Sequence, residues 1–212
     1  MSALIIANGD DVDKKALDGL NIECVICADG GLKKAKALGL TPDIIVGDFD
    51  SVDRDLLEKY RSMNIETVKF PVEKDFTDME LSIEIAADKG YRDIVLLGAT
   101  GGPRLDHSMA NMMLLEKYFN SGINIEIIDN NNSVKVVSDG TDLMIDGKKD
   151  RFVSLIPLTE EISGLSLVGF KYPLDRVSVK RGSTLCVSNE ISEEKGRVIL
   201  GKGTALLFVS KD

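Results

Sequence analysis

The chain has 212 residues, of which 43% are hydrophobic and 29% charged, and its net charge is −9. This length allows one large or two small domains, and the acidic surplus argues against a nucleic-acid partner because phosphates would be repelled. The apolar run at residues 3–7 is short and follows no cationic segment, and no run approaches the roughly 20 residues of a membrane helix. We therefore expect a cytoplasmic protein that does not act at a membrane.

Residues 1–128 alternate short apolar runs with segments of helical periodicity. Strands are expected at 4–7, 24–28, 44–46, 66–70, 94–97 and 123–128, and helices at 53–64, 78–89 and 108–119. This alternation predicts an α/β domain built on a doubly wound, mostly parallel, Rossmann-like sheet. Thr77 and Glu80 fit a capping box, so a helix should begin at residue 78. Met63, Met109 and Met113 are expected on the apolar faces of these helices.

The character of the sequence changes at residues 129–133, a turn-rich polar stretch that we interpret as a domain boundary. Residues 133–212 contain short apolar runs and no long helical period. The runs lie at 134–137, 143–145, 152–157, 165–170, 184–187, 198–200 and 205–209. This pattern predicts an all-β sandwich or barrel.

Two apparent motifs are better explained without function. Cys24 and Cys27 have C-x-x-C spacing, but on a strand their side chains point to opposite faces, so we expect both, like Cys186, to be core residues. Three cysteines give no disulfide framework. The segment 196–203 resembles a phosphate-binding loop, but Gly203 replaces the required Ser or Thr and β-like sequence follows. A hairpin turn is the simpler interpretation.

The most informative junction is Gly47-Asp48-Phe49-Asp50-Ser51, which follows the apolar run 44–46. The glycine allows a sharp turn, and the two carboxylates are hard oxygen ligands of the kind that Mg²⁺ takes together with substrate phosphates. An isolated pair of this kind is more often a solvated acidic turn. Here, similar junctions follow other strands.

Charged side chains follow four successive strands of the predicted sheet. In a parallel sheet, ligands bind outside the carboxyl ends of the strands, so these side chains should share one edge. Repulsion among carboxylates destabilises such a cluster unless a cation neutralises it, which predicts one or two Mg²⁺ ions holding a polyphosphate. The residues concerned are Asp29, Asp48, Asp50, Asp75, Asp78, Arg104 and Asp106.

Positive potential for a polyphosphate would come from Arg104 and from the backbone N–H groups around Gly101 and Gly102, just ahead of a helix. Several simpler roles stay open at this stage. Arg104 alone would often be a surface ion pair, and Asp75 a helix cap. His107 is the only histidine, and it is either a general base or a neutral side chain bonded to the next helical turn.

In order and spacing, these motifs strongly resemble the thiamine pyrophosphokinase family. The resemblance covers nearly the whole chain, and it rests on the segments 29–31, 41–51, 73–78, 104–107 with Asn111, 169–174 and 187–190. It implies transfer of pyrophosphate from ATP to thiamine, giving thiamine diphosphate and AMP, with Mg²⁺ as cofactor. It also implies a homodimer with its sites near the subunit interface.

The resemblance assigns roles to particular residues. The magnesium-binding and catalytic set is Asp48, Asp50, Asp75 and Asp78; the nucleotide-binding set is Asp29, Arg104, Asp106 and Asn111; thiamine would be contacted by Ser188 and Asn189. Asp75 or Asp78 would accept the hydroxyl proton. The chain departs from the family pattern at Pro103, which separates the glycine pair from Arg104, and in having no tryptophan to stack on the substrate ring.

Three other functions remain compatible with the residues. A pyrophosphokinase for a pterin alcohol would use the same acidic edge with a different acceptor. A metal-dependent nucleotide-sugar transferase would need the Asp-x-Asp pair but not the junctions at 75–78 and 104–107. A nucleotide sensor without turnover would have no need of so many carboxylates.

Overall fold

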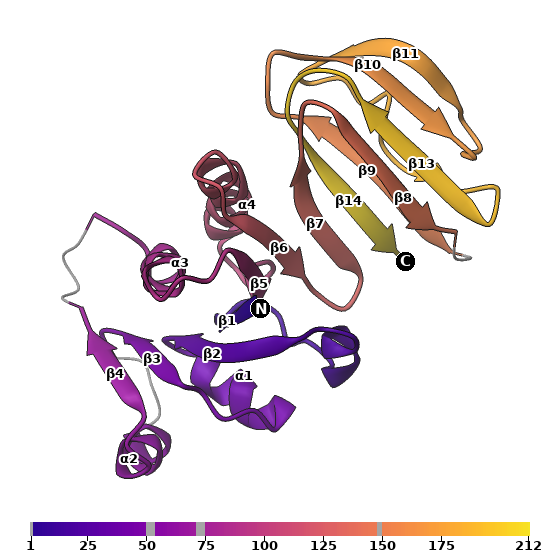
Figure 1. The fold of residues 1–212 in the computed structure, drawn as a ribbon. Coiled ribbons are helices and arrows are strands. Elements are labelled where there is room, and N and C mark those ends of the chain that lie inside the picture. The colour runs from indigo at the N-terminus through magenta and orange to yellow at the C-terminus, as the bar shows by residue number, and fades with distance from the viewer. Residues whose placement is uncertain (1, 50–53, 71–74, 148–149) are drawn as a thin grey trace. The chain divides into compact units, whose positions relative to one another are not determined.

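The computed structural model describes residues 2–49, 54–70, 75–147 and 150–212. The chain divides into two compact units, unit 1 at residues 1–130 and unit 2 at residues 131–212 (Figure 1). Within the described ranges, no helix is both long and apolar enough to cross a membrane.

Unit 1 is built on a parallel sheet, which confirms the predicted fold class. Its described strands are β1 (Ser2–Ile6), β2 (Ile22–Ala28), β3 (Ile44–Gly47), β4 (Glu66–Lys69), β5 (Asp93–Leu97) and β6 (Asn124–Ile128). They lie in the order β6-β5-β1-β2-β3-β4, and each neighbouring pair is parallel. The near-continuous apolar sequences of the central strands suit this position, because helices cover both faces.

The helices of unit 1 lie on opposite faces of this sheet (Figure 1). They are α1 (Gly31–Leu38), α2 (Arg54–Ser62), α3 (Asp78–Asp88) and α4 (Leu105–Phe119), and a short 3₁₀ helix, η1, spans Lys14–Leu17. One core cluster joins Leu4 and Ile6 of β1 to Leu32 of α1 and Tyr60 of α2. On the other face, α3 packs against β1, β2 and β3, and α4 packs against β6.

The predicted start of α3 at residue 78 is confirmed, and a side-chain cap explains it. Thr77 caps α3, since its hydroxyl oxygen accepts the backbone N–H of Glu80 at 3.2 Å. Helix α1 was not predicted from the sequence; its buried Leu32, Ala35 and Leu38 give only a short helical period, which ends at Gly39 in a left-handed conformation.

Three methionines that were expected on the apolar faces of helices are largely exposed. Met63 lies beyond the end of α2 and is 51% exposed, and Met109 and Met113 are 56% and 41% exposed. In α4 the buried positions are Ser108, Leu115 and Tyr118 instead. The apolar periodicity of α4 therefore describes an exposed stripe as well as a core face.

Unit 2 consists of two antiparallel sheets, which confirms the predicted sandwich. The described strands are β7 (Asn132–Val137), β8 (Thr141–Asp146), β9 (Arg151–Pro157), β10 (Glu161–Val168), β11 (Leu174–Lys180), β12 (Asn189–Glu190), β13 (Lys195–Leu200) and β14 (Ala205–Lys211). They are arranged as β12-β9-β14-β7 and β11-β10-β13-β8. Apolar side chains from both sheets, including Val153, Leu165, Val198 and Leu207, form one core.

Two details of unit 2 correct the predicted strands. Residues 184–187 form a turn rather than a strand, with the Val187 N–H donating to the Thr184 carbonyl. Of this segment only Cys186 enters the core, while Leu185 and Val187 are 61% and 45% exposed. Strand β11, which lies at the edge of its sheet and pairs with β10, was not predicted from the sequence. Its polar residues fit an edge strand, because a strand at the edge of a sheet has a neighbouring strand along only one of its two edges.

The cysteines behave as expected from the sequence. Cys24, Cys27 and Cys186 are free and buried. Burial raises the pKa of the Cys27 thiol to about 12, so it is protonated at neutral pH. None of the three has the properties of a reactive thiol.

Candidate active site

A cavity of about 520 Å³ opens at the carboxyl ends of β1, β2 and β5. The loops that follow these strands line it, together with the first turns of α3 and α4. In the sheet, β1 lies between β2 and β5, so the strand order reverses direction at β1. Ligands of open α/β sheets bind at the carboxyl ends of the strands where this reversal occurs. The volume is within the range of small-molecule sites.

The loops after β1 and β5 touch through their backbones. The Gly9 N–H donates to the Gly98 carbonyl at 2.7 Å, and a Cβ on Gly9 would lie 2.2 Å from the Thr100 carbonyl oxygen. A side chain at this position would separate the two loops, so glycine is required there. This contact forms one wall of the cavity.

Residues 98–104, here named the glycine loop, connect β5 to α4. Gly101 and Gly102 have φ values of 79° and 72°, the left-handed conformation that glycine adopts without strain. Side chains of α4 hold the loop from one side: the Asn111 Nδ2 donates to the Ala99 carbonyl at 2.7 Å, and the Ser108 hydroxyl donates to the Gly101 carbonyl at 3.5 Å.

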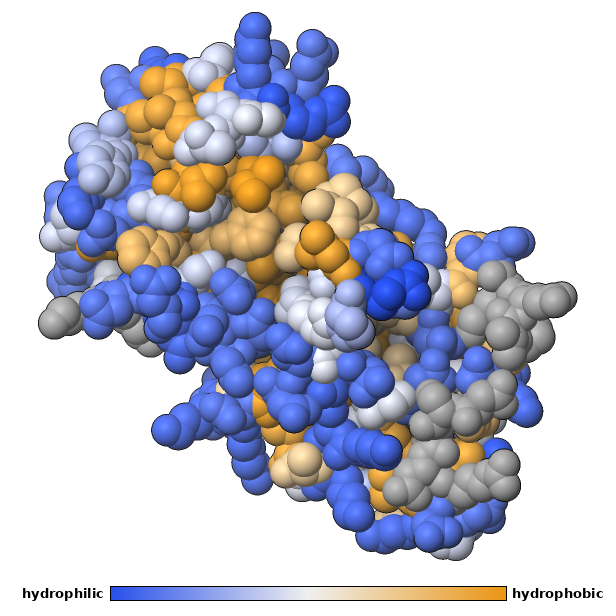
Figure 2. All heavy atoms as spheres, turned by 180° about the vertical axis from the view of Figure 1, so that it is seen from behind, coloured by the Kyte–Doolittle hydropathy of each residue, from blue (hydrophilic) through white to orange (hydrophobic). Residues whose placement is uncertain are grey.

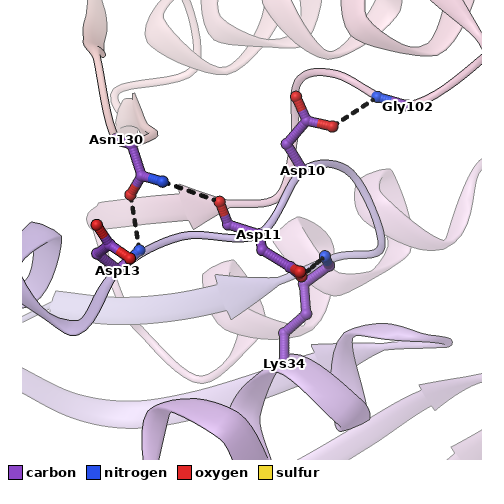
Figure 3. Close-up of polar contacts among 6 residues, drawn as sticks. All are labelled: Asp10, Asp11, Asp13, Lys34, Gly102 and Asn130. Atoms are coloured by element: carbon purple, nitrogen blue, oxygen red, sulfur yellow. Dashed lines mark hydrogen bonds and ion pairs between the residues drawn. The ribbon is translucent and has the colours of Figure 1, made fainter.

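On the other side of this loop, the Gly102 N–H makes a hydrogen bond within the protein. It donates to the Asp10 Oδ1 at 3.0 Å (Figure 3). The expectation that this N–H would help to bind a phosphate therefore does not hold in this conformation. The positive potential at the cavity comes instead from Arg104 and from the N-terminal ends of α3 and α4.

Four of the predicted site residues line the cavity: Asp29, Asp78, Arg104 and Asn111. Asp29 follows β2 with φ 44°, and its carboxylate packs on Gly47, where a Cβ would lie 1.8 Å from the Asp29 Oδ1. Asp78 is the first residue of α3. His107, whose role was left open, also lines the cavity.

The other predicted carboxylates are placed differently. Asp48 follows β3 and Asp75 precedes α3, but neither lines the cavity, and nor does Asp106. Asp50 lies outside the described residues. In the part of the chain that the structure describes, no three His, Cys, Asp or Glu side chains form a group that could hold a metal ion. The donors have the right chemistry for Mg²⁺, but the described ones alone do not complete a site.

Arg104 and Asp106 form a bidentate ion pair at the start of α4. The Arg104 Nε donates to one carboxylate oxygen at 2.8 Å and its terminal nitrogen to the other at 2.5 Å, although both side chains are more than 60% exposed. The hydrogen bond from Arg104 lowers the pKa of Asp106 to about 2. Asp106 thus orients the guanidinium beside the cavity.

This ion pair predicts that the Asp106 carboxyl group stays ionised to an unusually low pH. Because the pKa of Asp106 is lowered in the folded protein, the pair favours the folded state above the ordinary aspartate pKa, and this advantage is lost as the pH falls through about 2. Titration followed by carboxyl ¹³C NMR should give an Asp106 pKa near 2 in the wild type. In Arg104→Ala the value should rise to the ordinary range, and equal values in the two proteins would contradict the assignment.

Part of the cavity lining was not predicted from the sequence. Asn8 and Gly9 after β1, and Phe76 and Met79 at α3, line it but carry no charge. The Asn8-Gly9 pair, one residue beyond the central strand β1, was the available signal, since a turn at the carboxyl end of that strand lies at the ligand-binding edge.

The two residues predicted to contact thiamine lie in unit 2. Asn189 is 5% exposed; its Nδ2 donates to the Tyr172 carbonyl at 2.8 Å, and its Oδ1 accepts the N–H groups of Tyr172 and Glu190. Ser188 is exposed and has φ 58°. Asn189 therefore fixes the backbone around Tyr172, and the contact of both residues with thiamine stays a prediction.

Comparison with known proteins gives consistent matches over both units. Residues 20–127 match the family model described as thiamin pyrophosphokinase, catalytic domain, and residues 141–204 match thiamin pyrophosphokinase, vitamin B1 binding domain. Thiamine pyrophosphokinase of Bacillus subtilis is 34% identical over 187 residues, which cover 88% of this chain and 87% of that protein.

Solved structures agree with the sequence matches. The crystal structure of thiamine pyrophosphokinase from B. subtilis superposes with a TM-score of 0.89 at 32% identity and covers all of both chains. The structure of thiamin pyrophosphokinase from Geobacillus thermodenitrificans gives 0.85 at 33% identity, covering 100% of this chain and 98% of that one. The chain belongs to the thiamine pyrophosphokinase family.

Proposed function

We propose that this chain transfers the pyrophosphoryl group of ATP to the hydroxyethyl oxygen of thiamine, giving thiamine diphosphate and AMP. One observation carries the proposal. The cavity at the carboxyl ends of β1, β2 and β5 places Asp78, Arg104 and Asn111 together inside the unit that matches the family's catalytic domain. The family membership favours thiamine over a pterin alcohol as acceptor, and pyrophosphoryl transfer over nucleotide-sugar transfer.

The residues at the cavity suit pyrophosphoryl transfer, which is catalysed mainly by positioning and charge stabilisation. ATP would place its phosphates at the N-terminal ends of α3 and α4, beside Arg104. The thiamine oxygen forms a bond to the β-phosphorus while the bond from that phosphorus to the bridging α–β oxygen breaks and AMP leaves. Asp78 accepts the hydroxyl proton; it is preferred to Asp75 because it lines the cavity.

We propose that Mg²⁺ binds with ATP and that Asp48, Asp50, Asp75 and Asp78 supply its protein ligands. When bound, the ion would neutralise charge on the transferred phosphates. The support is chemical: these are oxygen donors from the carboxyl ends of β3 and β4, and one of them, Asp78, lines the cavity. Asp29, Arg104, Asp106 and Asn111 are proposed to surround the nucleotide.

The proposed reaction is tested by its products. Purified protein incubated with ATP, Mg²⁺ and thiamine should give AMP and thiamine diphosphate in equal amounts, measured by ³¹P NMR. Stoichiometric ADP with thiamine monophosphate would contradict pyrophosphoryl transfer. A pterin alcohol in place of thiamine is the control for the acceptor, and its preferential use would overturn the assignment of thiamine.

We propose that the protein is a homodimer in which Ser188 and Asn189 of one subunit approach the cavity of the other. Exposed apolar side chains support a second copy as partner. Leu105, Met109 and Met113 recur at i, i+4 and i+8 on α4 and are 80%, 56% and 41% exposed. In unit 2, Figure 2 shows apolar side chains (orange) gathered on one face. Contiguous exposed apolar surface of this kind marks an interaction site.

Complementation between two inactive variants tests the shared site. Asp78→Asn removes a carboxylate from the cavity, and Ser188→Arg places a large side chain at an exposed position of the proposed thiamine contact. Random mixing gives half mixed dimers with one intact site each, so activity should return to about a quarter of the wild type. Each variant refolded alone is the control. No recovery from mass-verified mixed dimers, or a monomer on sedimentation, would contradict the proposal.

We propose a cytoplasmic location. The three free, buried cysteines suit a reducing compartment, where disulfides are rare. Fractionation of cells that produce the protein, with detection by antibody, tests this location directly.

A further inference from the structure

A short acidic loop, residues 10–13, joins parts of unit 1 that are far apart in the sequence (Figure 3). The Asp11 carboxylate accepts a hydrogen bond from the Lys34 Nζ of α1 at 2.6 Å, and the two form an ion pair. The Lys34 side chain is only 12% exposed. Asn130, just beyond β6, accepts the Asp13 N–H at 2.7 Å and donates to the Asp11 carbonyl at 3.2 Å. The acidic loop is therefore held from two sides.

Asp10, the first residue of this loop, holds the glycine loop. Its N–H donates to the Thr100 carbonyl at 2.9 Å, and its Oδ1 accepts the Gly102 N–H at 3.0 Å. It also fills the space beside Gly101, where a Cβ would lie 2.0 Å from the carboxyl carbon of Asp10. One residue thus contacts three consecutive positions of the glycine loop.

The glycine loop needs such a contact more than an ordinary loop does. Two adjacent glycines have a larger choice of backbone conformations than other residues, so ordering them costs more entropy. Gly101 and Gly102 line the cavity, and the loop ends at Arg104. A change in their conformation would move both the wall of the cavity and the guanidinium.

We propose that Asp10 is a positioning residue for nucleotide binding: it fixes the glycine loop in the conformation that receives the phosphates. Asp10 itself does not line the cavity, so it acts through Gly102 and not by touching the nucleotide. Its own position is set by the contacts of Lys34 and Asn130 with the acidic loop. This inference rests on the proposed use of the cavity for ATP.

Two variants of Asp10 separate the hydrogen bond from the charge. Asp10→Ala removes the acceptor for the Gly102 N–H and should weaken ATP binding about tenfold, or about 1.4 kcal/mol, with the KM for thiamine unchanged. Asp10→Asn keeps an oxygen acceptor and should stay within about twofold of the wild type. Asp18→Ala, an exposed aspartate of the same unit, is the matched control. Binding of ATP with Mg²⁺ is measured by calorimetry without thiamine.

A third variant keeps the test decisive if Asp10→Ala unfolds. Gly101→Ala places a methyl group against Asp10 and should lose as much ATP affinity, so wild-type affinity in this variant would contradict the inference whether or not Asp10→Ala folds. Where Asp10→Ala does fold, the double variant should lose no more than either single one. Wild-type affinity in Asp10→Ala, or equal losses in Asp10→Ala and Asp10→Asn, would overturn the inference. If the wild type binds ATP but forms no thiamine diphosphate, the proposed reaction fails while this binding test still applies.

Discussion

Gly31→Ala should destabilise unit 1 by about 3 kcal/mol, because the new methyl group has no space. A Cβ at Gly31 would lie 2.0 Å from the Ile6 carbonyl oxygen and 2.6 Å from its carbon, and both atoms are backbone of β1. Relief requires α1 to move away from the central strand, which disrupts the core around Leu4, Ile6 and Leu32. Urea unfolding followed by circular dichroism measures the loss.

Gly39→Ala, at the other end of α1, is the matched control. Gly39 has φ 73°, and the nearest atom to a new Cβ would be the Lys14 Nζ at 4.0 Å, so only backbone strain is added. The expected loss is about 1 kcal/mol. If Gly31→Ala costs no more than Gly39→Ala, the close packing of α1 on β1 is contradicted.

Asp78→Asn should have the largest effect on turnover, lowering kcat/KM at least about 100-fold. The proposal makes Asp78 both a magnesium ligand and the acceptor of the hydroxyl proton, and the amide can do neither well. Changes beside metal ligands already cost about 10–100-fold, so loss of a ligand should cost more. Raising the Mg²⁺ concentration should recover only part of the rate, since the proton acceptor is missing as well.

Asp88→Asn, at the last position of α3, controls for the change of charge on the same helix. Asp88 is exposed and lies away from the cavity, so its variant should turn over like the wild type. Asp50→Asn, at a position outside the described residues, should show the magnesium effect without the loss of the base. Wild-type turnover of Asp78→Asn at low Mg²⁺ would exclude both proposed roles.

The fold of unit 1 was predictable because its central strands are nearly all apolar and most of its helices have a clear period. The elements that were missed have weaker patterns for physical reasons. Helix α1 is short and contains three lysines, and β11 is an edge strand whose polar residues face water. The turn at 184–187 resembles a strand in sequence because apolar residues flank Cys186, but only Cys186 enters the core, where its carbonyl accepts the Leu155 N–H at 2.9 Å.

The charged part of the site followed from the rule that parallel strands end at one edge. Asp29, Asp78 and Arg104 meet at the cavity for this reason. The same rule says nothing of what holds a loop in place. Asp10 lies 92 positions before Gly102, and the contact between them depends on two loops meeting in space. The role of Asn189 in fixing Tyr172 was hidden for the same reason.

The division of the chain has a consequence for synthesis. Unit 1 is one continuous segment that ends at Asn130, and its helices, its parallel strands and the contacts of the acidic loop all lie within it. The ribosome therefore completes the proposed catalytic unit before it adds the 82 residues of unit 2, since 212 minus 130 is 82. At bacterial or eukaryotic rates this interval lasts roughly 4–16 s, longer than most small domains need to fold. A parallel sheet, which is slow to form, thus has time to assemble before the second half of the chain is complete.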